Sequence, residues 1–338
     1  MTHADARPYI WMLCGSFSFS VMAVLAEALT HATAESPPLC DWQTVAVFRA
    51  ALVAIFAAIL AKQASVRLVW WRPARLWVRS IAGSCSMVCT FYAFGNLRSS
   101  DVVTLSNTFP LWVAVLSWPL YGRLPSRKTF LAIIIGVIGV ALVEQPHWET
   151  GNWGVAAALA AAAFTAIAML GLHHLHDIDP RAVVVHFSVV ATGFCVATYF
   201  LTPRSYTLHS LLDYRVALML LGIGISATIG QVFLTLAFGR GAPAKVSVVG
   251  LMQIVFVLLM SIVIFDHPVN GLTLLGTVLV VAPTAWLLTQ PKTAVSPASS
   301  PHPGPTADAI PTVKVAGPPQ AAHAVAQDHP LDSPALQP

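Results

Sequence analysis

The sequence predicts an all-α polytopic membrane protein with ten transmembrane helices, arranged as two inverted five-helix repeats. Three observations support this fold: few charges, ten apolar segments, and two halves that resemble each other. Of the 338 residues, 57% are hydrophobic and only 9% are Asp, Glu, Lys or Arg, whereas a soluble domain carries roughly 25% charged residues. This composition excludes an ordinary soluble enzyme, and the formal net charge of only +4 argues against a nucleic-acid-binding protein.

Ten apolar segments have the length of a membrane-spanning helix, which needs roughly 20 residues. Charged and turn-forming residues separate them, as in Glu35–Pro38, Pro125–Lys128 and Gly239–Pro243. The first segment is too long for the 7–15-residue core of a signal peptide, so we interpret it as a helix. The predicted helices are 9–31, 43–62, 76–96, 102–121, 129–146, 152–173, 182–202, 216–238, 244–265 and 271–289.

Basic residues predict the orientation. With the N-terminus in the cytoplasm, 14 basic residues fall in inner segments, three in outer loops and one, Arg49, inside a helix. The positive-inside rule therefore predicts that both termini are cytoplasmic, and we expect the inner (plasma) membrane of a bacterium. The inner residues are Arg7, Lys62, Arg67, Arg72, Arg75, Arg79, Arg123, Arg127, Lys128, Arg181, Arg240, Lys245, Lys292 and Lys314, and the outer ones are Arg98, Arg204 and Arg215.

The two halves share a pattern. Ala93-Phe94-Gly95 ends the third predicted helix and Ala237-Phe238-Gly239 ends the eighth, 144 residues later. Each is followed by a turn, a helix, another turn and a last helix with a glycine (Gly136 and Gly276). Because five is odd, the second half must be inserted upside down, as in the inverted repeats of many secondary transporters. The predicted parts are a cytoplasmic N-terminus (1–8), two repeats (9–146 and 152–289) and a tail (290–338).

The tail differs in composition from the rest of the chain. Between Pro291 and Pro338, 48 residues contain 11 prolines and 10 alanines, without hydrophobic periodicity. Such a segment buries too little apolar surface to offset its ordering entropy. We expect it to be a disordered cytoplasmic tail.

These features support a family resemblance. The chain resembles the drug/metabolite transporter superfamily, and within it the EamA-domain transporters with ten helices, over residues 9–289. The matching motifs are Val47-Phe48-Arg49-Ala50 in the second helix, the polar turn and proline of Ser99–Pro110, and the Gln-bearing ninth helix with an acidic end, Gln253–Pro268. Relatives often carry Lys in the first helix where this chain has Glu27.

Two formal charges lie well inside the predicted helices, where each costs at least roughly 2.5–3.5 kcal/mol. Glu27 lies about four residues from the outer end of the first helix and Arg49 about six from the outer end of the second. Their matched depth predicts either an ion pair between them or contact with a substrate in an outward-facing cavity. The two interpretations are compatible.

His186 lies about four residues from the inner end of the seventh helix. Inversion of the repeats places it roughly where Arg49 lies in the first half. Its pKa is near neutral when unperturbed, so it is a candidate for proton coupling. The alternative is an interfacial hydrogen-bonding histidine.

Neutral residues complete the candidate substrate site. Buried amides must find partners or face water, which favours Asn107, Gln231 and Gln253 as cavity residues. Tyr92 and Trp112 could stack on a flat substrate, although aromatic residues at such spacings more often pack. Pro110 is expected to kink the fourth helix.

The predicted function is secondary active or facilitative transport, as an exporter of a small metabolite, by alternating access at a cavity between the repeats. A membrane-embedded lipid- or prenyl-processing enzyme and a non-transporting scaffold are the alternatives. No phosphate-cradling Gly-Lys loop is present, and the His/Asp cluster at 173–179 lacks metal-ligand spacing. We therefore expect no catalysis, cofactor or metal. The expected partners are a small-molecule substrate and the lipid bilayer, with a homodimer left open.

Overall fold

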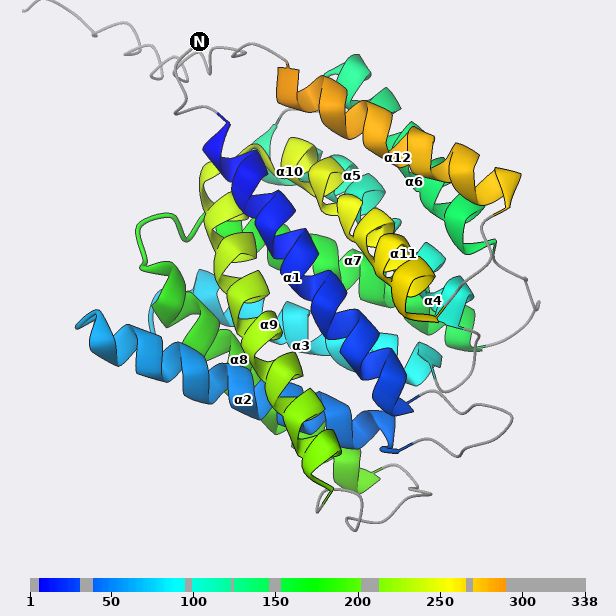
Figure 1. Cartoon of the computed structure of the whole chain (residues 1–338). Coiled ribbons are helices and arrows are strands. Elements are labelled where there is room, and N and C mark those ends of the chain that lie inside the picture. The colour runs from blue at the N-terminus through cyan, green and yellow to red at the C-terminus, as the bar shows by residue number, and fades with distance from the viewer. Residues whose placement is uncertain are drawn as a thin grey trace, which may run out of the picture. The chain divides into compact units, whose positions relative to one another are not determined.

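The computed structural model describes residues 6–30, 39–94, 99–122, 125–145, 153–201, 213–265 and 270–289. Every regular element within these ranges is an α-helix. The first half contains α1 (Arg7–Thr30), α2 (Trp42–Gln63), α3 (Ala74–Phe94), α4 (Ser99–Ser106), α5 (Phe109–Tyr121) and α6 (Arg127–Glu144). The second half contains α7 (Trp153–His173), α8 (Pro180–Leu201), α9 (Tyr214–Arg240), α10 (Pro243–Gly250), α11 (Met252–Phe265) and α12 (Gly271–Thr289), as Figure 1 shows. The tail predicted over 290–338 lies outside the described residues.

Eight of the ten predicted segments form single helices, and the fourth and ninth each form two, α4–α5 and α10–α11. By length and composition, seven helical segments in the described ranges could cross a membrane: α1, α2, α7, α8, α9, the combined segment 243–264, and α12. Of the remaining segments, α6 carries three charged residues among its 18, and α4 and α5 are short. The all-α membrane fold is confirmed, and the number ten remains a prediction.

The two broken helices interrupt the chain at matching points. The pairs α4 and α10, and α5 and α11, end 144 residues apart, the interval that separates the two Ala-Phe-Gly sequences. Pro110 occupies the first turn of α5, where its missing N–H is tolerated. No proline causes the break between α10 and α11. There the Ser16 hydroxyl on α1 donates a hydrogen bond to the Gly250 carbonyl (3.4 Å). The Ser20 hydroxyl shares its one proton between the Ser16 carbonyl of its own helix (2.8 Å) and the Gln253 carbonyl (3.0 Å).

Helix packing relates the halves by a pseudo-two-fold axis. The most extensive contacts join α1 to α9 and, equivalently, α7 to α3. Likewise α2 packs on α9 as α8 packs on α3. The remaining large contacts, α2 with α8 and α6 with α12, join equivalent helices to each other across the axis; α12 and α6 lie side by side in Figure 1.

The equivalent helices α6 and α12 run antiparallel, as expected for an inverted repeat. A Cβ added to Gly139 on α6 would lie 2.8 Å from the Gly276 carbonyl and 2.9 Å from Val280, whereas one added to Gly276 would lie 2.8 Å from the backbone of Val143. The order along α6 is thus opposite to the order along α12. Small residues let these backbones approach closely, as is common between helices in membranes.

Candidate functional site

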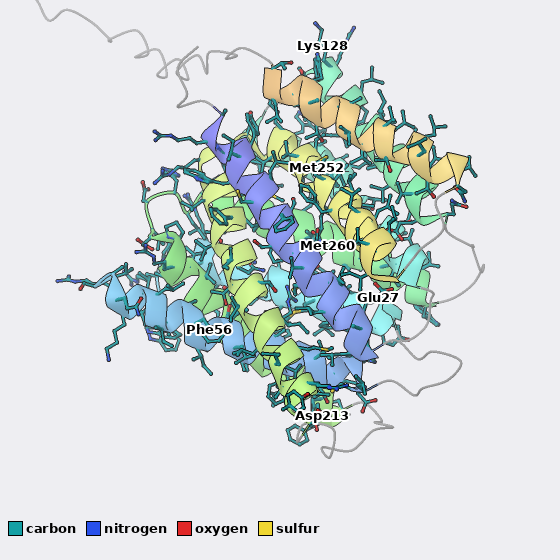
Figure 2. The ribbon with its side chains drawn as sticks, in the orientation of Figure 1. Glu27, Phe56, Lys128, Asp213, Met252 and Met260 are labelled. Carbon is teal, nitrogen blue, oxygen red and sulfur yellow. The ribbon has the colours of Figure 1, made fainter. Side chains whose placement is uncertain are left out.

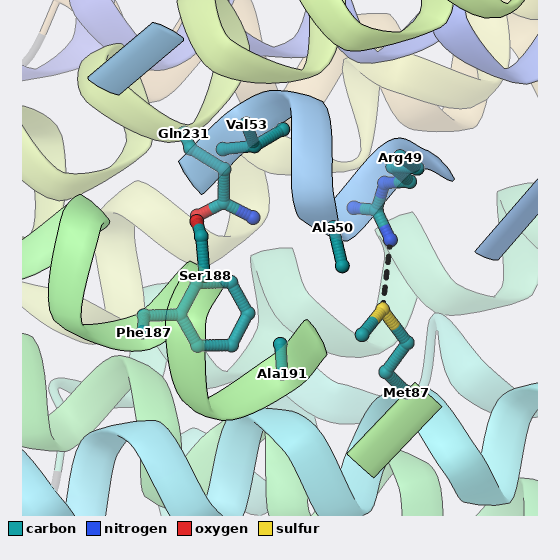
Figure 3. Close-up of a pocket in the computed structure, with 8 residues that line it drawn as sticks. All are labelled: Arg49, Ala50, Val53, Met87, Phe187, Ser188, Ala191 and Gln231. Atoms are coloured by element: carbon teal, nitrogen blue, oxygen red, sulfur yellow. Dashed lines mark hydrogen bonds between the residues drawn. The ribbon is translucent and has the colours of Figure 1, made fainter. Parts of the chain in front are cut away.

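A small pocket lies where α2 and α8 cross. It is lined by Arg49, Ala50 and Val53 from α2, Met87 from α3, Phe187, Ser188 and Ala191 from α8, and Gln231 from α9, as Figure 3 shows. Val53 and Ala191 lie halfway along their helices. The pocket has room for about one water molecule. It is therefore a small site near the middle of the helices.

The pocket residues form equivalent pairs from the two repeats. The starts of α2 and α8, Trp42 and Pro180, are 138 residues apart, and both helices have 22 residues. This interval pairs Arg49 with Phe187, Ala50 with Ser188 and Val53 with Ala191. The 144-residue interval pairs Met87 with Gln231. The pocket thus lies on the pseudo-two-fold axis, but its chemistry is asymmetric.

Arg49 does not form the ion pair that was one interpretation of the sequence. Its Nη1 donates a hydrogen bond to Sδ of Met87 at 3.1 Å, and its buried Nε has no hydrogen-bond partner (Figure 3). Glu27 on α1 (Figure 2) is exposed. Among the described residues, the charged side chain that interacts electrostatically with it is Glu144, which is also acidic. The prediction of the pair failed because α1 and α2 share few contacts, although they are consecutive.

Two further polar atoms in the pocket are unpaired. The Oε1 atom of Gln231 and the hydroxyl of Ser188 are buried and without hydrogen-bond partners, and the residues are only 7% and 1% exposed. The sequence predicts Gln231 as a cavity residue, whereas Ser188 was not predicted. Adding the 138-residue interval between α2 and α8 to Ala50, the residue after Arg49, gives Ser188. The correct interval would therefore have placed Ser188 at the site.

His186 lies beside the pocket but points elsewhere. It is 1% exposed, its Nε2–H donates to the Trp70 carbonyl at 3.1 Å, and its Nδ1 lies 2.8 Å from the Ser80 hydroxyl. The ring also packs edge-on against Trp77, with centroids 4.7 Å apart. The equivalent of Arg49 is Phe187, one residue later, so the sequence placed His186 next to the correct position.

Arg79 is a buried charge that the sequence analysis assigned to the cytoplasmic side. It lies in the second turn of α3 and is 1% exposed. Its guanidinium lies 4.3 Å from the centre of the Phe187 ring, and its Nε and Nη1 have no hydrogen-bond partners. Gly83 leaves room for this stack, since a Cβ there would lie 2.7 Å from the Phe187 ring. Glu27 and Arg49 are therefore not the only charges well inside the helices.

A comparison with known families decides which family these repeats belong to. The profile of the EamA-like transporter family matches the chain twice, over residues 6–144 and 152–289. The chain belongs to the EamA-like transporter family. Its two matched segments contain the two halves that the packing relates by the pseudo-two-fold axis.

Relatives of this EamA protein are transporters by name. The pseudopaline exporter CntI of Pseudomonas aeruginosa is 28% identical over 277 residues, covering 79% of this chain and 90% of the relative. Human solute carrier family 35 member G1 is 22% identical over 288 residues, covering 80% and 76%. A solved crystal structure with 17% identity shares the fold, with a TM-score of 0.65 over 80% of this chain and 96% of that chain. The protein is thus an integral membrane transporter of the drug/metabolite transporter family.

The other predicted site residues of this EamA protein lie outside the pocket. Tyr92 on α3 and Trp112 on α5 are 48% and 37% exposed. Asn107, at the break between α4 and α5, donates from Nδ2 to the Val103 carbonyl at 2.9 Å. Gln253 contributes its carbonyl to the contact with Ser20. The structure therefore brings together only Arg49 and Gln231 of the predicted set.

The part of the chain that the structure describes contains no group of three or more His, Cys, Asp or Glu side chains that could hold a metal ion. In the predicted His/Asp cluster, His176 pairs with Asp177 at 3.2 Å, and both side chains are exposed. The relatives' names are consistent with a protein that is not an enzyme.

Proposed function

We propose that this protein exports a small metabolite across the inner membrane by alternating access at the pocket between α2 and α8. The observation that carries the proposal is the composition of the pocket, in which residues at equivalent positions of both repeats face one another on the pseudo-two-fold axis. Inverted-repeat transporters bind substrate at such an interface and expose it by rocking one repeat against the other. The two orientations of the repeats would then open the pocket to opposite sides of the membrane.

The small size of the pocket fits one stage of this cycle. A metabolite is much larger than the one water molecule that the pocket accommodates, so α2 and α8 must separate before substrate enters. Ala50 and Ala191 pack in one cluster on either side of the pocket. The direction of export is proposed by similarity to the pseudopaline exporter. Cytoplasmic termini are proposed from the distribution of basic residues.

Transport is tested with purified protein in liposomes loaded with a bacterial metabolite extract. We expect compounds to leave these vesicles without ATP, detected by mass spectrometry against protein-free vesicles. Arg49→Ala should reduce this efflux at least tenfold, because it removes the charged group of the pocket. Efflux equal to that of protein-free vesicles would refute the transport function.

The rocking movement is tested by bridging the pocket. In a variant whose five native cysteines are replaced by serine, Ala50→Cys with Ala191→Cys should be joined by a short cleavable thiol reagent. We expect bridging to stop efflux and cleavage to restore it. The matched control pair, Ile55→Cys with Val189→Cys, lies on the same helices at exposed positions (53% and 43%). Undiminished efflux from the bridged protein would contradict movement at this interface.

A further inference from the structure

The pocket region holds positive charge that the described residues do not balance. Arg49 has one recorded hydrogen bond, to the sulfur of Met87, which is a weak acceptor. Behind the pocket, Arg79 lies over the Phe187 ring with two unpaired nitrogens. Within the described ranges, neither guanidinium forms an ion pair with an acidic side chain. Two guanidinium groups thus lie in or behind the pocket without an acidic partner among the described residues.

An unpaired cation at membrane depth is unfavourable, and such residues normally have a partner or face a wet cavity. Arg49 faces a cavity, so its missing partner has a place to bind. A carboxylate is the matching group, because its two oxygens accept parallel hydrogen bonds from the planar guanidinium. A neutral ligand would leave the charge unpaired, and a cationic ligand would be repelled.

The remaining pocket atoms define a second point of recognition. The Oε1 atom of Gln231 and the hydroxyl of Ser188 are buried and unpaired, and both residues line the pocket (Figure 3). Both can accept a hydrogen bond from a donor group on the same ligand. The ring of Phe187 and the methyl groups of Val53 and Ala191 supply the apolar wall between these points.

We propose that the transported ligand is a small organic anion whose carboxylate binds the guanidinium of Arg49. This inference rests on the proposed transport function and specifies its substrate class. Arg79 does not line the pocket; it is a positioning residue that holds the Phe187 ring and adds to the positive potential of the site. A single guanidinium in the pocket matches a ligand with one acidic group there.

Cys195 offers a competing explanation within the protein. This buried cysteine interacts electrostatically with Arg49, so its thiolate could serve as the counter-ion. In that case Cys195→Ser would leave Arg49 unpaired and would change anion binding. If the ligand supplies the negative charge, Cys195→Ser should leave anion binding unchanged.

The test measures the melting temperature of the detergent-purified full chain with 100 mM acetate, acetamide or chloride at equal ionic strength. A ligand that binds only the native state stabilises it, so acetate should raise the melting temperature by about 2 °C or more and acetamide should not. Cys195→Ser should keep the shift, Arg49→Lys should keep part of it, and Arg49→Gln should lose it. Equal effects of acetate and acetamide, or an acetate shift that persists in Arg49→Gln, would overturn the proposal. If Arg49→Gln fails to fold, the comparison of acetate with acetamide in the unaltered chain decides.

Failure of this inference can be distinguished from failure of transport. In the metabolite-loaded liposomes described above, the exported compounds are identified and sorted by charge. Predominantly carboxylate-bearing compounds would support the inference. Export of neutral compounds, cations or phosphate esters without carboxylates would refute it while leaving transport intact. Absence of any export would refute transport itself, whatever the result with acetate.

Discussion

At the scale of single residues, Phe187 connects the pocket to the buried guanidinium of Arg79. It lines the pocket with Arg49, and its ring lies 4.3 Å from the Arg79 guanidinium. Such a desolvated cation–π contact contributes about 2 kcal/mol. This contact therefore helps to hold the Phe187 ring in the wall of the pocket.

We expect Phe187→Leu to lower the melting temperature, because leucine keeps much of the buried apolar surface but loses the ring under Arg79. In an Arg79→Met background, the same change should lower it less, because the cation is already absent. Thermal melts in detergent of the unaltered protein, the two single variants and the double variant measure this difference. Equal losses in both backgrounds would show that the cation–π contact contributes nothing and that only packing is lost.

His186 is the residue on which proton coupling can be tested. Both of its partners, the Ser80 hydroxyl and the Trp70 carbonyl, can accept hydrogen bonds. The site could therefore hold a protonated imidazole without moving. If His186 carries the proton, His186→Gln should abolish transport driven by a pH gradient while leaving exchange between equal pools intact. Gradient-driven transport that survives in His186→Gln would remove this residue from the coupling mechanism.

The exact register between the two repeats could not be predicted from the sequence. The interval between halves was read from the Ala-Phe-Gly sequences as 144, but α2 and α8 are 138 residues apart. The connection after α8 is two residues longer than the one after α2, and α9 has four more residues before its Ala-Phe-Gly sequence than α3 has. An error of one residue rotates a side chain by about 100° around a helix. Arg49 and Gln231 were identifiable from polarity alone, whereas Ser188 and Phe187 required the correct register.

At the scale of elements, the broken helices depend on neighbours for their hydrogen bonds. Pro110 made the first break predictable, but the second, before Met252, has no such signal in the sequence. Two backbone carbonyls at this break, those of Gly250 and Gln253, accept hydrogen bonds from serines of α1, and Ser20 is 233 residues away from Gln253. Because these hydrogen bonds come from another helix, the sequence around Met252 does not predict the break.

Ser20→Ala should therefore destabilise the protein through the break between α10 and α11. The change leaves the Gln253 carbonyl without the Ser20 hydroxyl, which costs about 1 kcal/mol and lowers the melting temperature by about 2–4 °C. Ser18→Ala is the matched control, because the Ser18 hydroxyl bonds only to Cys14 in its own helix at 2.9 Å. Similar melting temperatures for both variants would show that the contact with α11 does not support the break.

At the scale of the whole molecule, pseudo-symmetry bears on the number of membrane crossings. The three segments that fail the length-and-composition criterion are α3, α4–α5 and α6, all in the first half. Their equivalents α9, α10–α11 and α12 all satisfy it. Since α3 packs on α7 as α9 packs on α1, a first half that crossed the membrane fewer times would break the relation between equivalent helices. The symmetry favours ten crossings.

The number of membrane crossings determines on which side of the membrane each terminus lies. Seven crossings place the two termini on opposite sides of the membrane, whereas ten place both on the same side, which the basic residues predict to be the cytoplasm. Reporters active only inside or only outside the cell, fused in turn to each terminus of the full chain, measure this. We expect cytoplasmic signals from both fusions. A third fusion after Gln145, at the end of α6, should report the outer side, because five crossings precede it. A cytoplasmic signal there would mean that the two halves are not inverted with respect to the membrane, and alternating access about the α2–α8 pocket would lose its structural basis.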